Sequence, residues 1–142
     1  EAEAHFITRD LTGGLDDGEG TPDIVVTSPA TRVLDAANGQ VRLAVHELGR
    51  GRAVYATGLP YSAQNSRLLH RAIFWAAGCQ EEFSAWAALD PRVEVAAYPD
   101  GRTTLVINNS LEPVTTTVPT PRGPRTVRLE EGGHQWLTAA SQ

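Results

Sequence analysis

Residues 49–78 read GRGRAVYATGLPYSAQNSRLLHRAIFWAAG, and this stretch decides the fold. The opening GRGR indicates a turn, and residues 53–57 are an apolar run of strand length. The next residues, Gly-Leu-Pro, end the run because proline has no amide hydrogen to donate. Apolar side chains then recur at helical intervals, which predicts a helix with Ser62 as N-cap and Gly78 just past its end. The apolar face of this helix is expected to contain Leu68, Leu69, Ala72, Ile73 and Ala76.

The residues before this stretch predict a small sheet. Short β-prone runs occupy residues 23–27 and 31–34, and apolar and polar side chains alternate over residues 41–45. Asn38-Gly39 is a dipeptide that favours a type I′ hairpin turn. Residues 5–8 are also apolar enough for a strand or the tail of one. We therefore expect a meander of three or four strands that leads into one helix, with too few helices to cover both faces of the sheet.

Residues 11–20 are rich in glycine and acidic side chains, which predicts an exposed loop. The acidic residues are Asp16, Asp17 and Glu19. A calcium loop of the EF-hand type needs regularly spaced oxygen ligands and a closing glutamate. That spacing is missing, so a solvated acidic loop is the favoured interpretation.

The second half of the chain changes to an all-β pattern. Residues 81–90 carry apolar side chains at spacings of three and predict a short helix that connects two units. From residue 92 onward, β-prone runs recur about every ten residues with turn signals between them. These runs are residues 93–98, 103–107, 114–118, 126–129 and 135–137. The spacing predicts a small antiparallel β-sandwich.

The composition limits the possible functions. The 142 residues carry a formal net charge of -5, which argues against nucleic acid as a partner because phosphate contacts need clustered basic side chains. No apolar run approaches the roughly 18 residues of a membrane span, so we expect no membrane partner. The single cysteine, Cys79, excludes a disulfide within the chain and is interpreted as a small apolar side chain near the helix end.

The titratable side chains form no recognisable catalytic motif. The four histidines lack the spacing of metal ligands, and we expect no metal and no cofactor. They are His5, His46, His70 and His134. Glycoside cleavage needs a pair of carboxylates. Four carboxylates are candidates for such a pair, and the residues around them give none of them further support. They are Asp10, Asp35, Glu47 and Glu94.

The turn between the predicted strand and helix is the strongest candidate for a ligand site. It follows the carboxyl end of a strand, where α/β sheets place their ligands. Tyr61, Asn65 and Arg67 could together bind a sugar or an anion. They could equally cap the helix and pack at a domain interface, and that structural interpretation is favoured.

Three aromatic side chains offer a second possibility. Trp86, Tyr98 and Trp136 could form a platform on which a sugar ring stacks, as in an independent carbohydrate-binding module. The favoured interpretation is that they pack in the core of the β-sandwich.

Several segments together resemble one enzyme family. The segments are GLPYS (58–62), NSRLL (65–69), EVAAYP (94–99) and VINNS (106–110). None is specific alone, but in combination they resemble the part near the C-terminus of the galacto-N-biose/lacto-N-biose phosphorylases. The resemblance covers nearly the whole chain after residue 4.

The resemblance implies a division of the chain. Residues 5–80 would be the last part of a glutamine-amidotransferase-like α/β domain, residues 81–91 a connector and residues 92–142 a small C-terminal β domain. The expected fold class is therefore mixed α+β. A partial amidotransferase-like unit, made of a β-meander and a helix, would be followed by a small antiparallel β-sandwich.

The resemblance also implies a role. The parent enzyme would cleave a β-1,3-galactosyl-N-acetylhexosamine with phosphate, in the cytoplasm, and give galactose 1-phosphate with inversion. Its general acid and sugar-binding residues would lie on a (β/α) barrel outside this sequence, so no catalytic residue is carried over and we expect a non-catalytic fragment. The expected partners are the rest of the parent enzyme, a second copy in a homodimer, and a galactosyl saccharide. The alternatives are an independent carbohydrate-binding module and a fragment of a β-galactosidase-like enzyme.

Two features concern how the chain was produced. Residues 1–4, EAEA, match the spacer that a yeast secretion leader leaves behind, and we interpret them as an expression remnant. In a chain secreted from yeast, the tripeptide Asn108-Asn109-Ser110 would be a glycosylation acceptor, with the glycan on Asn108.

Overall fold

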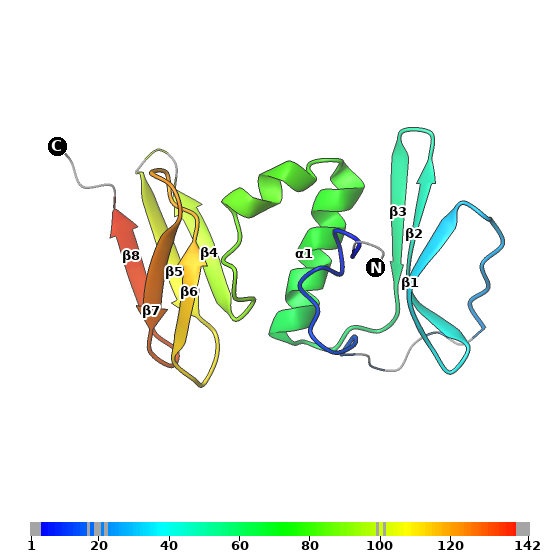
Figure 1. Ribbon diagram of the computed structural model, residues 1–142, viewed down its shortest axis with the longest axis horizontal. Helices are drawn as coiled ribbons and strands as arrows, with labels where there is room; N and C mark the ends of the chain where they lie inside the picture. The colour runs from blue at the N-terminus through cyan, green and yellow to red at the C-terminus, as the bar shows by residue number, and fades with distance from the viewer. Residues whose placement is uncertain are drawn as a thin grey trace. The chain divides into compact units, whose positions relative to one another are not determined.

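The computed structural model describes residues 4–16, 18, 21, 23–98, 100 and 102–138. The chain divides into two compact units, Glu1–Gln80 (unit 1) and Glu81–Gln142 (unit 2). Among the described residues, eight strands form three small antiparallel sheets, accompanied by one α-helix (Figure 1). The mixed α+β class predicted from the sequence is confirmed.

Unit 1 contains a three-stranded meander. Strands β1 (Thr31–Ala37), β2 (Gln40–Leu48) and β3 (Gly51–Ala56) lie in the order β1-β2-β3, and both pairs are antiparallel. The turn between β1 and β2 has positive φ at Asn38 (52°) and Gly39 (75°), as a type I′ turn requires. The predicted meander and its hairpin turn are confirmed.

Two other predicted strands of unit 1 are wrong. Residues 5–8 lie in a turn, in which the Thr8 amide donates to the His5 carbonyl oxygen at 2.9 Å. Residues 23–27 lie outside any sheet, and the Val25 side chain is exposed. Both runs contain β-prone side chains, but β-propensity takes effect only where a neighbouring strand and a packed face are available.

Helix α1 (Ala63–Ala77) begins and ends where the sequence predicts. The Ser62 hydroxyl oxygen accepts a hydrogen bond from the Asn65 amide at 3.0 Å, which is the N-cap contact. At the other end, Gly78 adopts a left-handed conformation with φ of 75° and takes part in a Schellman motif. Glycine suits this position because it has no Cβ to oppose a positive φ.

The buried face of α1 differs from the predicted one. Leu68 and Ala72 are buried as expected, but Leu69 (51% exposed), Ile73 (55% exposed) and Ala76 are not. The side chains buried instead lie on the other flank of Leu68, and they include Arg67, Arg71 and Trp75. With 3.6 residues per helical turn, the buried face is rotated by roughly a quarter turn from the predicted one. The periodicity of the sequence could not show which side is buried, because the apolar side chains are spread over a wide arc of the helix surface. Arginine also counts as a polar residue in such a pattern, so the buried arginines gave no signal.

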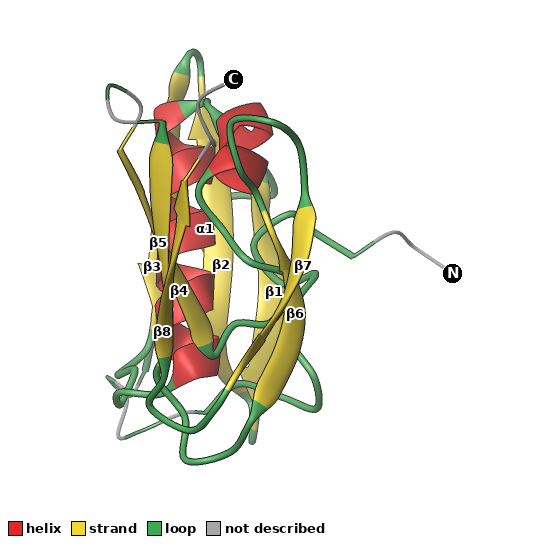
Figure 2. Ribbon diagram, turned by 90° about the vertical axis from the view of Figure 1, so that its left-hand side faces the viewer, coloured by secondary structure: helices red, strands yellow, loops and turns green. Residues whose placement is uncertain are grey.

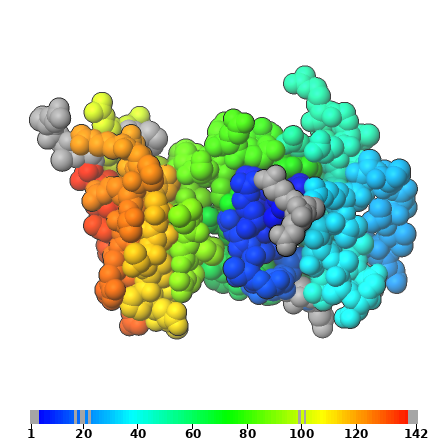
Figure 3. All heavy atoms as spheres, viewed as in Figure 1, coloured from blue at the N-terminus to red at the C-terminus, as the bar shows by residue number. Residues whose placement is uncertain are grey.

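The core of unit 1 depends on a segment without regular secondary structure. Ile7 and Leu15 are buried together with apolar side chains of β2 and α1. We call residues 5–16, which contribute these two side chains, the N-terminal strap (blue in Figure 3). The expectation of an exposed loop from residue 11 is therefore wrong at Leu15.

Unit 2 is a small β-sandwich. Strands β4, β5 and β8 form one sheet in that order, strands β6 and β7 form the other, and every pair is antiparallel (Figure 2). The strand bounds are β4 (Val93–Tyr98), β5 (Thr103–Asn108), β6 (Val114–Val118), β7 (Arg125–Leu129) and β8 (His134–Thr138). The five predicted strands and the sandwich are confirmed.

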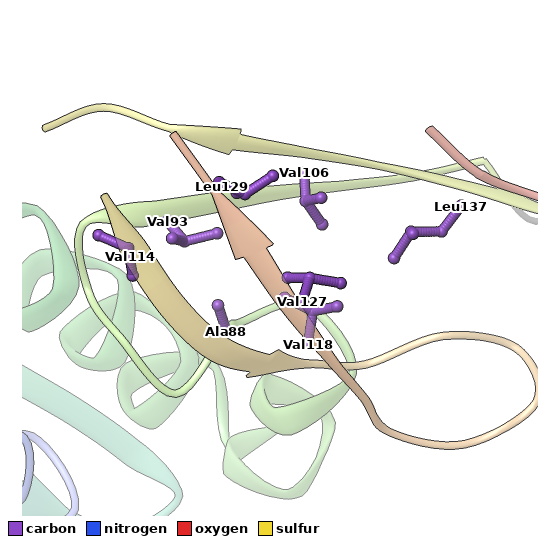
Figure 4. Close-up of a cluster of buried hydrophobic side chains, with 8 residues drawn as sticks. All are labelled: Ala88, Val93, Val106, Val114, Val118, Val127, Leu129 and Leu137. Carbon is purple, nitrogen blue, oxygen red and sulfur yellow. The ribbon is translucent and has the colours of Figure 1, made fainter. Parts of the chain in front are cut away.

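Alternation along these strands fills the space between the two sheets. The core consists of aliphatic side chains from all five strands together with one residue before them (Figure 4). They are Ala88, Val93, Val106, Val114, Val118, Val127, Leu129 and Leu137. The helix predicted over 81–90 is shorter and tighter than expected, a 3-10 helix η1 (Gln80–Ala85) with Phe83 buried.

Candidate functional site

The loop between β3 and α1 carries the residues predicted to bind a ligand. The helix has no acidic side chain in its own first turn. Instead the Ser62 hydroxyl donates to Asp16 Oδ2 at 2.6 Å, so that a carboxylate of the strap lies at the helix N-terminus. A negative charge there is favourable because the first amide groups of the helix carry partial positive charge.

Asn65 connects the two loops at this end of the helix. Its side chain is buried, and Nδ2 donates to the Asp16 carbonyl oxygen at 2.7 Å and to the Pro60 carbonyl oxygen at 2.6 Å. The neighbouring Gln64 makes two contacts of the same kind, with its Oε1 accepting from the Thr12 amide at 3.1 Å and its Nε2 donating to the Gly14 carbonyl oxygen at 2.8 Å. The first turn of α1 is therefore bound to the strap by side-chain amides.

Arg67 belongs to an ion-pair cluster farther along the strap. Arg71 donates to Asp10 Oδ2 through Nε at 2.8 Å and Nη2 at 2.6 Å, and Arg67 Nη1 lies 3.5 Å from the same oxygen. The Arg71 guanidinium also lies over the Phe6 ring, 4.8 Å from its centroid. Both arginine side chains are buried, so the carboxylate offsets part of the cost of removing their charges from water.

The three predicted ligand residues are thus divided. Tyr61 is almost fully exposed, whereas Asn65 and Arg67 are buried and contact the strap. Among the described residues, Asn65 Oδ1 is buried without a hydrogen-bond partner. Ligand binding by these residues remains a prediction, because the structure shows only the contacts that they make within the chain.

The sequence indicates neither Asp10 nor Asp16 as a partner of the helix. Its patterns relate Asp10 only to glycoside chemistry and place Asp16 only in a solvated loop. Asp16 lies 46 positions before Ser62, and Asp10 lies 61 positions before Arg71. No local spacing along the chain could relate residues so far apart. Asp17 and Glu19, the other acidic residues of that loop, lie outside the described residues, as do residues 1–3 of the suspected expression remnant.

Two of the four histidines, His5 and His46, make contacts with different neighbours. The His5 ring packs edge-on against Trp75, with 5.4 Å between ring centroids, and His46 Nδ1 lies 3.0 Å from the Thr31 hydroxyl. Burial lowers the pKa of His5 below its ordinary value, and the positive charge of Arg32 lowers it further. The negative charge of Glu47 opposes this lowering of the pKa in part, and Arg9 has the smallest lowering effect. The described residues contain no group of three or more His, Cys, Asp or Glu side chains that could hold a metal ion.

Cys79, Glu47 and Glu94 have ordinary surroundings, whereas Asp35 Oδ2 is buried without a hydrogen-bond partner among the described residues. Cys79 is half-buried beside the end of α1, with its Sγ 3.7 Å from the Phe74 carbonyl oxygen. Glu47 Oε1 lies 3.9 Å from Arg52 Nε, and Glu94 Oε2 accepts from Asn109 Nδ2 at 3.2 Å. In the part of the chain that is described, no helix is long and apolar enough to cross a membrane.

Asn108 has a structural role in unit 2. Its side chain is buried, and Nδ2 donates to the carbonyl oxygens of Glu112 at 2.7 Å and Glu130 at 2.9 Å. Its Oδ1 accepts from the amide and the hydroxyl of Ser110. A glycan on Nδ2 would disrupt these contacts, so the geometry speaks against the predicted glycosylation of the folded unit.

The expectation of aromatic side chains in the sandwich core is wrong for all three residues considered. Tyr98, Trp136 and Trp86 are each about half exposed. Tyr98 and Trp136 contact each other, with ring centroids 5.8 Å apart and ring planes inclined by 36°. The core is filled by aliphatic side chains instead, which leaves an aromatic pair on the surface of unit 2.

Two family models match the chain in sequence order. The model described as the lacto-N-biose phosphorylase central domain matches residues 1–81. The model described as the lacto-N-biose phosphorylase C-terminal domain matches residues 86–137.

Curated relatives carry corresponding names. A 1,3-β-galactosyl-N-acetylhexosamine phosphorylase of Lachnoclostridium phytofermentans is 40% identical over 118 residues, and a second from the same organism is 42% identical over 116 residues. These matches cover 83% and 82% of this chain but 16% of each relative. A phosphorylase of the same name from Bifidobacterium longum is 42% identical over 106 residues, which is 75% of this chain and 14% of the relative. The chain therefore matches a small part of much longer proteins.

Proposed function

The chain belongs to the lacto-N-biose phosphorylase family, and on that premise we propose that it is a non-catalytic part of a glycoside phosphorylase. The proposed parent enzyme cleaves a β-1,3-galactosyl-N-acetylhexosamine with phosphate and releases galactose 1-phosphate with inversion, in the cytoplasm. Its general acid and sugar site would lie on a barrel elsewhere in the longer polypeptide. The names of the relatives support this choice of reaction.

The chemistry of the reaction supports a non-catalytic role. Inversion requires a general acid on one face of the sugar and an attacking group on the opposite face. The strongest candidate ligand site in this chain, at the first turn of α1, uses Asn65 and Arg67 to bind the N-terminal strap. In the proposal these side chains stabilise the domain and do not act on substrate.

The observation that carries the proposal is the second apolar stripe of α1. Leu68, Ala72 and Trp75 face the core of unit 1, whereas Leu69 and Ile73 are more than half exposed on another side of the helix. A helix that is apolar on two sides is typical of one buried between two layers. Because the relatives are about six times longer than the matched part, we propose that the remainder of the parent polypeptide covers this stripe.

A chimera tests this role. The matching segment of the Bifidobacterium longum phosphorylase would be replaced by this chain, and the release of galactose 1-phosphate from the disaccharide and phosphate would be measured. We expect an active chimera, and we expect the Leu69→Glu/Ile73→Glu double variant to lose assembly and activity. Leu111→Glu is the matched control, because Leu111 is an exposed leucine of unit 2.

Three results would contradict the proposal. Release of galactose 1-phosphate by the isolated chain would show that it has a catalytic site of its own. Full activity of the double variant would show that Leu69 and Ile73 do not contact the remainder of the parent polypeptide. A concentration-dependent dimer of the isolated chain, abolished by the double variant, would show that a second copy of the chain covers this stripe instead.

A further inference from the structure

The outer face of the β4-β5-β8 sheet follows from the strand register. Tyr98 lies opposite Thr103, which lies opposite Thr138. In the next rung on the same face, Ala96 lies opposite Leu105, which lies opposite Trp136. Directly opposed residues of antiparallel strands point to the same face. These six residues therefore form one surface, which we call the aromatic face.

The aromatic face presents two rings that lie close together. Tyr98 is 49% exposed and Trp136 is 54% exposed, although they come from strands at opposite edges of the sheet. Their ring centroids are 5.8 Å apart and their planes are inclined by 36°, so the two rings contact each other at a tilt. The two rings therefore form a small exposed apolar patch on unit 2.

The size and charge of the aromatic face limit what it can bind. An aromatic side chain can bury about 150–250 Å², so two half-exposed rings offer on the order of 200 Å². A stable protein–protein interface buries about 800 Å² on each partner, which is several times larger. None of the six residues in the two rungs is charged, and the next rung of the same face, in which Glu94 lies opposite Ile107 and Ile107 opposite His134, adds a carboxylate, which disfavours an anionic ligand. The face therefore suits a small neutral ligand better than a protein, a nucleic acid or an anion.

We propose that Tyr98 and Trp136 bind a neutral saccharide by stacking on the C–H face of a pyranose ring. The axial hydrogens of a pyranose form a flat apolar side. Its hydroxyl groups lie around the rim of the ring. The two rings would contact the apolar side, and Thr103 and Thr138, which lie in the same rung as Tyr98, would lie at the edge of the sugar. A galactosyl residue fits this description, because its axial 4-hydroxyl leaves the hydrogens on carbons 3, 4 and 5 together on one side.

The choice of a galactosyl ligand rests on the proposed function, whereas the stacking site rests on the geometry of unit 2. The site would hold saccharide without cleaving it. Its test therefore uses binding to the isolated 142-residue chain and needs no phosphorylase activity.

The three tryptophans allow a direct test by nuclear magnetic resonance. Each indole N–H gives one signal, and Trp75 is buried while Trp86 is half exposed outside the aromatic face. Titration with β-1,3-galactosyl-N-acetylglucosamine is expected to shift the Trp136 signal to saturation and to leave the Trp75 and Trp86 signals unchanged. Trp136→Ala, followed through the Tyr98 ring signals, is expected to bind about tenfold more weakly, the change that one good aromatic contact is worth.

Matched variants keep the test decisive. Trp86→Ala removes a half-exposed tryptophan of the same unit and should leave binding unchanged. Trp136→Leu and Tyr98→Leu keep apolar bulk on the sheet but remove the ring, so weaker binding with an unchanged melting temperature supports stacking.

Further ligands separate the possible outcomes. Binding of the galactosyl disaccharide and of cellobiose supports a general pyranose site, and a preference for the galactosyl sugar supports the more specific form. An equal response to an acyclic polyol such as mannitol would overturn the proposal, because mannitol has no ring face. Absence of a saturable shift, or a Trp136 shift that depends on protein concentration without sugar, would also overturn it.

Discussion

The core of unit 2 is built from alternating side chains of five strands, whereas the core of unit 1 also needs Ile7 and Leu15 from a segment without regular structure. The polar contacts differ in the same way. In unit 2 the buried Asn108 binds carbonyl groups within 22 positions of itself, but in unit 1 the helix binds strap residues 46 to 65 positions away. Unit 2 is stabilised by alternating apolar side chains along its strands, whereas helix α1 of unit 1 is held in place by the strap. Unit 2 should therefore tolerate the loss of one long-range contact better than unit 1. Variants with changes in one unit should test this difference.

Asp10→Ala should have the largest effect, and the effect should be confined to unit 1. The change removes the carboxylate that contacts both buried arginines of α1. We expect the free energy of unfolding to fall by about 3 kcal/mol. This is the lower end of the range for breaking a buried ion pair, because Asp10 is itself 24% exposed. Amide hydrogen exchange should show reduced protection in α1 and unchanged protection in β5 and β6.

The control for Asp10→Ala is Glu130→Ala, which removes a carboxylate from a pair with Arg128 that is mostly exposed on both sides. Such pairs contribute about 0–1 kcal/mol. Equal losses in the two variants would show that the strap does not hold the helix through Asp10.

Asn108→Ala should lower the free energy of unfolding of unit 2 by about 2 kcal/mol, because the buried Asn108 side chain loses its hydrogen bonds to the carbonyl oxygens of Glu112 and Glu130. Urea unfolding followed by the exchange of unit 2 amides measures this loss. Asn109→Ala is the matched control, since the Asn109 side chain is exposed and its amide donates to a carboxylate, that of Glu94, at the surface. A loss in unit 1 of similar size would contradict the independence of the two cores.

Ser62→Ala should lower the free energy of unfolding of unit 1 by about 1 kcal/mol, which is the usual contribution of an N-cap. The variant loses both the bond from the Asn65 amide and the bond to Asp16. Thermal unfolding followed by circular dichroism should show the loss. Ser66→Ala, inside the same helix, should have little effect, and equal behaviour of the two variants would argue against the cap as a determinant of the strap contact.

The smallest predicted effect is a pH dependence from His5. Burial lowers the pKa of His5 below its ordinary value of 6.5 in the folded chain, so the unfolded chain binds the proton more tightly. Its contribution to stability is therefore fully present above pH 6.5 and is lost as the pH falls from there through the lowered pKa. Melting temperatures measured across this range should fall less steeply with decreasing pH in His5→Gln than in the original chain, and identical slopes would exclude His5 as the cause.

Local patterns are sufficient for the elements but not for their packing. The N-cap at Ser62, the left-handed Gly78 and the turn at Asn38-Gly39 depend on neighbouring residues, and all three predictions are confirmed. The β-prone run at residues 23–27 has the right composition and no strand to pair with. Propensity indicates what a segment can form, and a partner decides whether it forms.

The candidate sites show the same limit. Tyr61, Asn65 and Arg67 are neighbours in the sequence, yet one is exposed and the other two are buried beneath a segment about 50 to 60 positions earlier. Tyr98 and Trp136 are 38 positions apart, and only the pairing of β4 and β8 with β5 brings their rings together. Spacing along the chain could not predict either arrangement.

The amino-acid sequence alone was enough to establish the family, the mixed α+β class, the hairpin, the helix with both of its ends, and the five strands of unit 2. These depend on dihedral preferences, short-range hydrogen bonds and side-chain alternation, which act over a few residues. The tertiary structure decided which side of α1 is buried, which carboxylates meet its arginines, and which aromatic rings remain on the surface. Those outcomes depend on which distant surfaces become neighbours when the chain removes apolar area and charge from water, and this is a property of the whole fold.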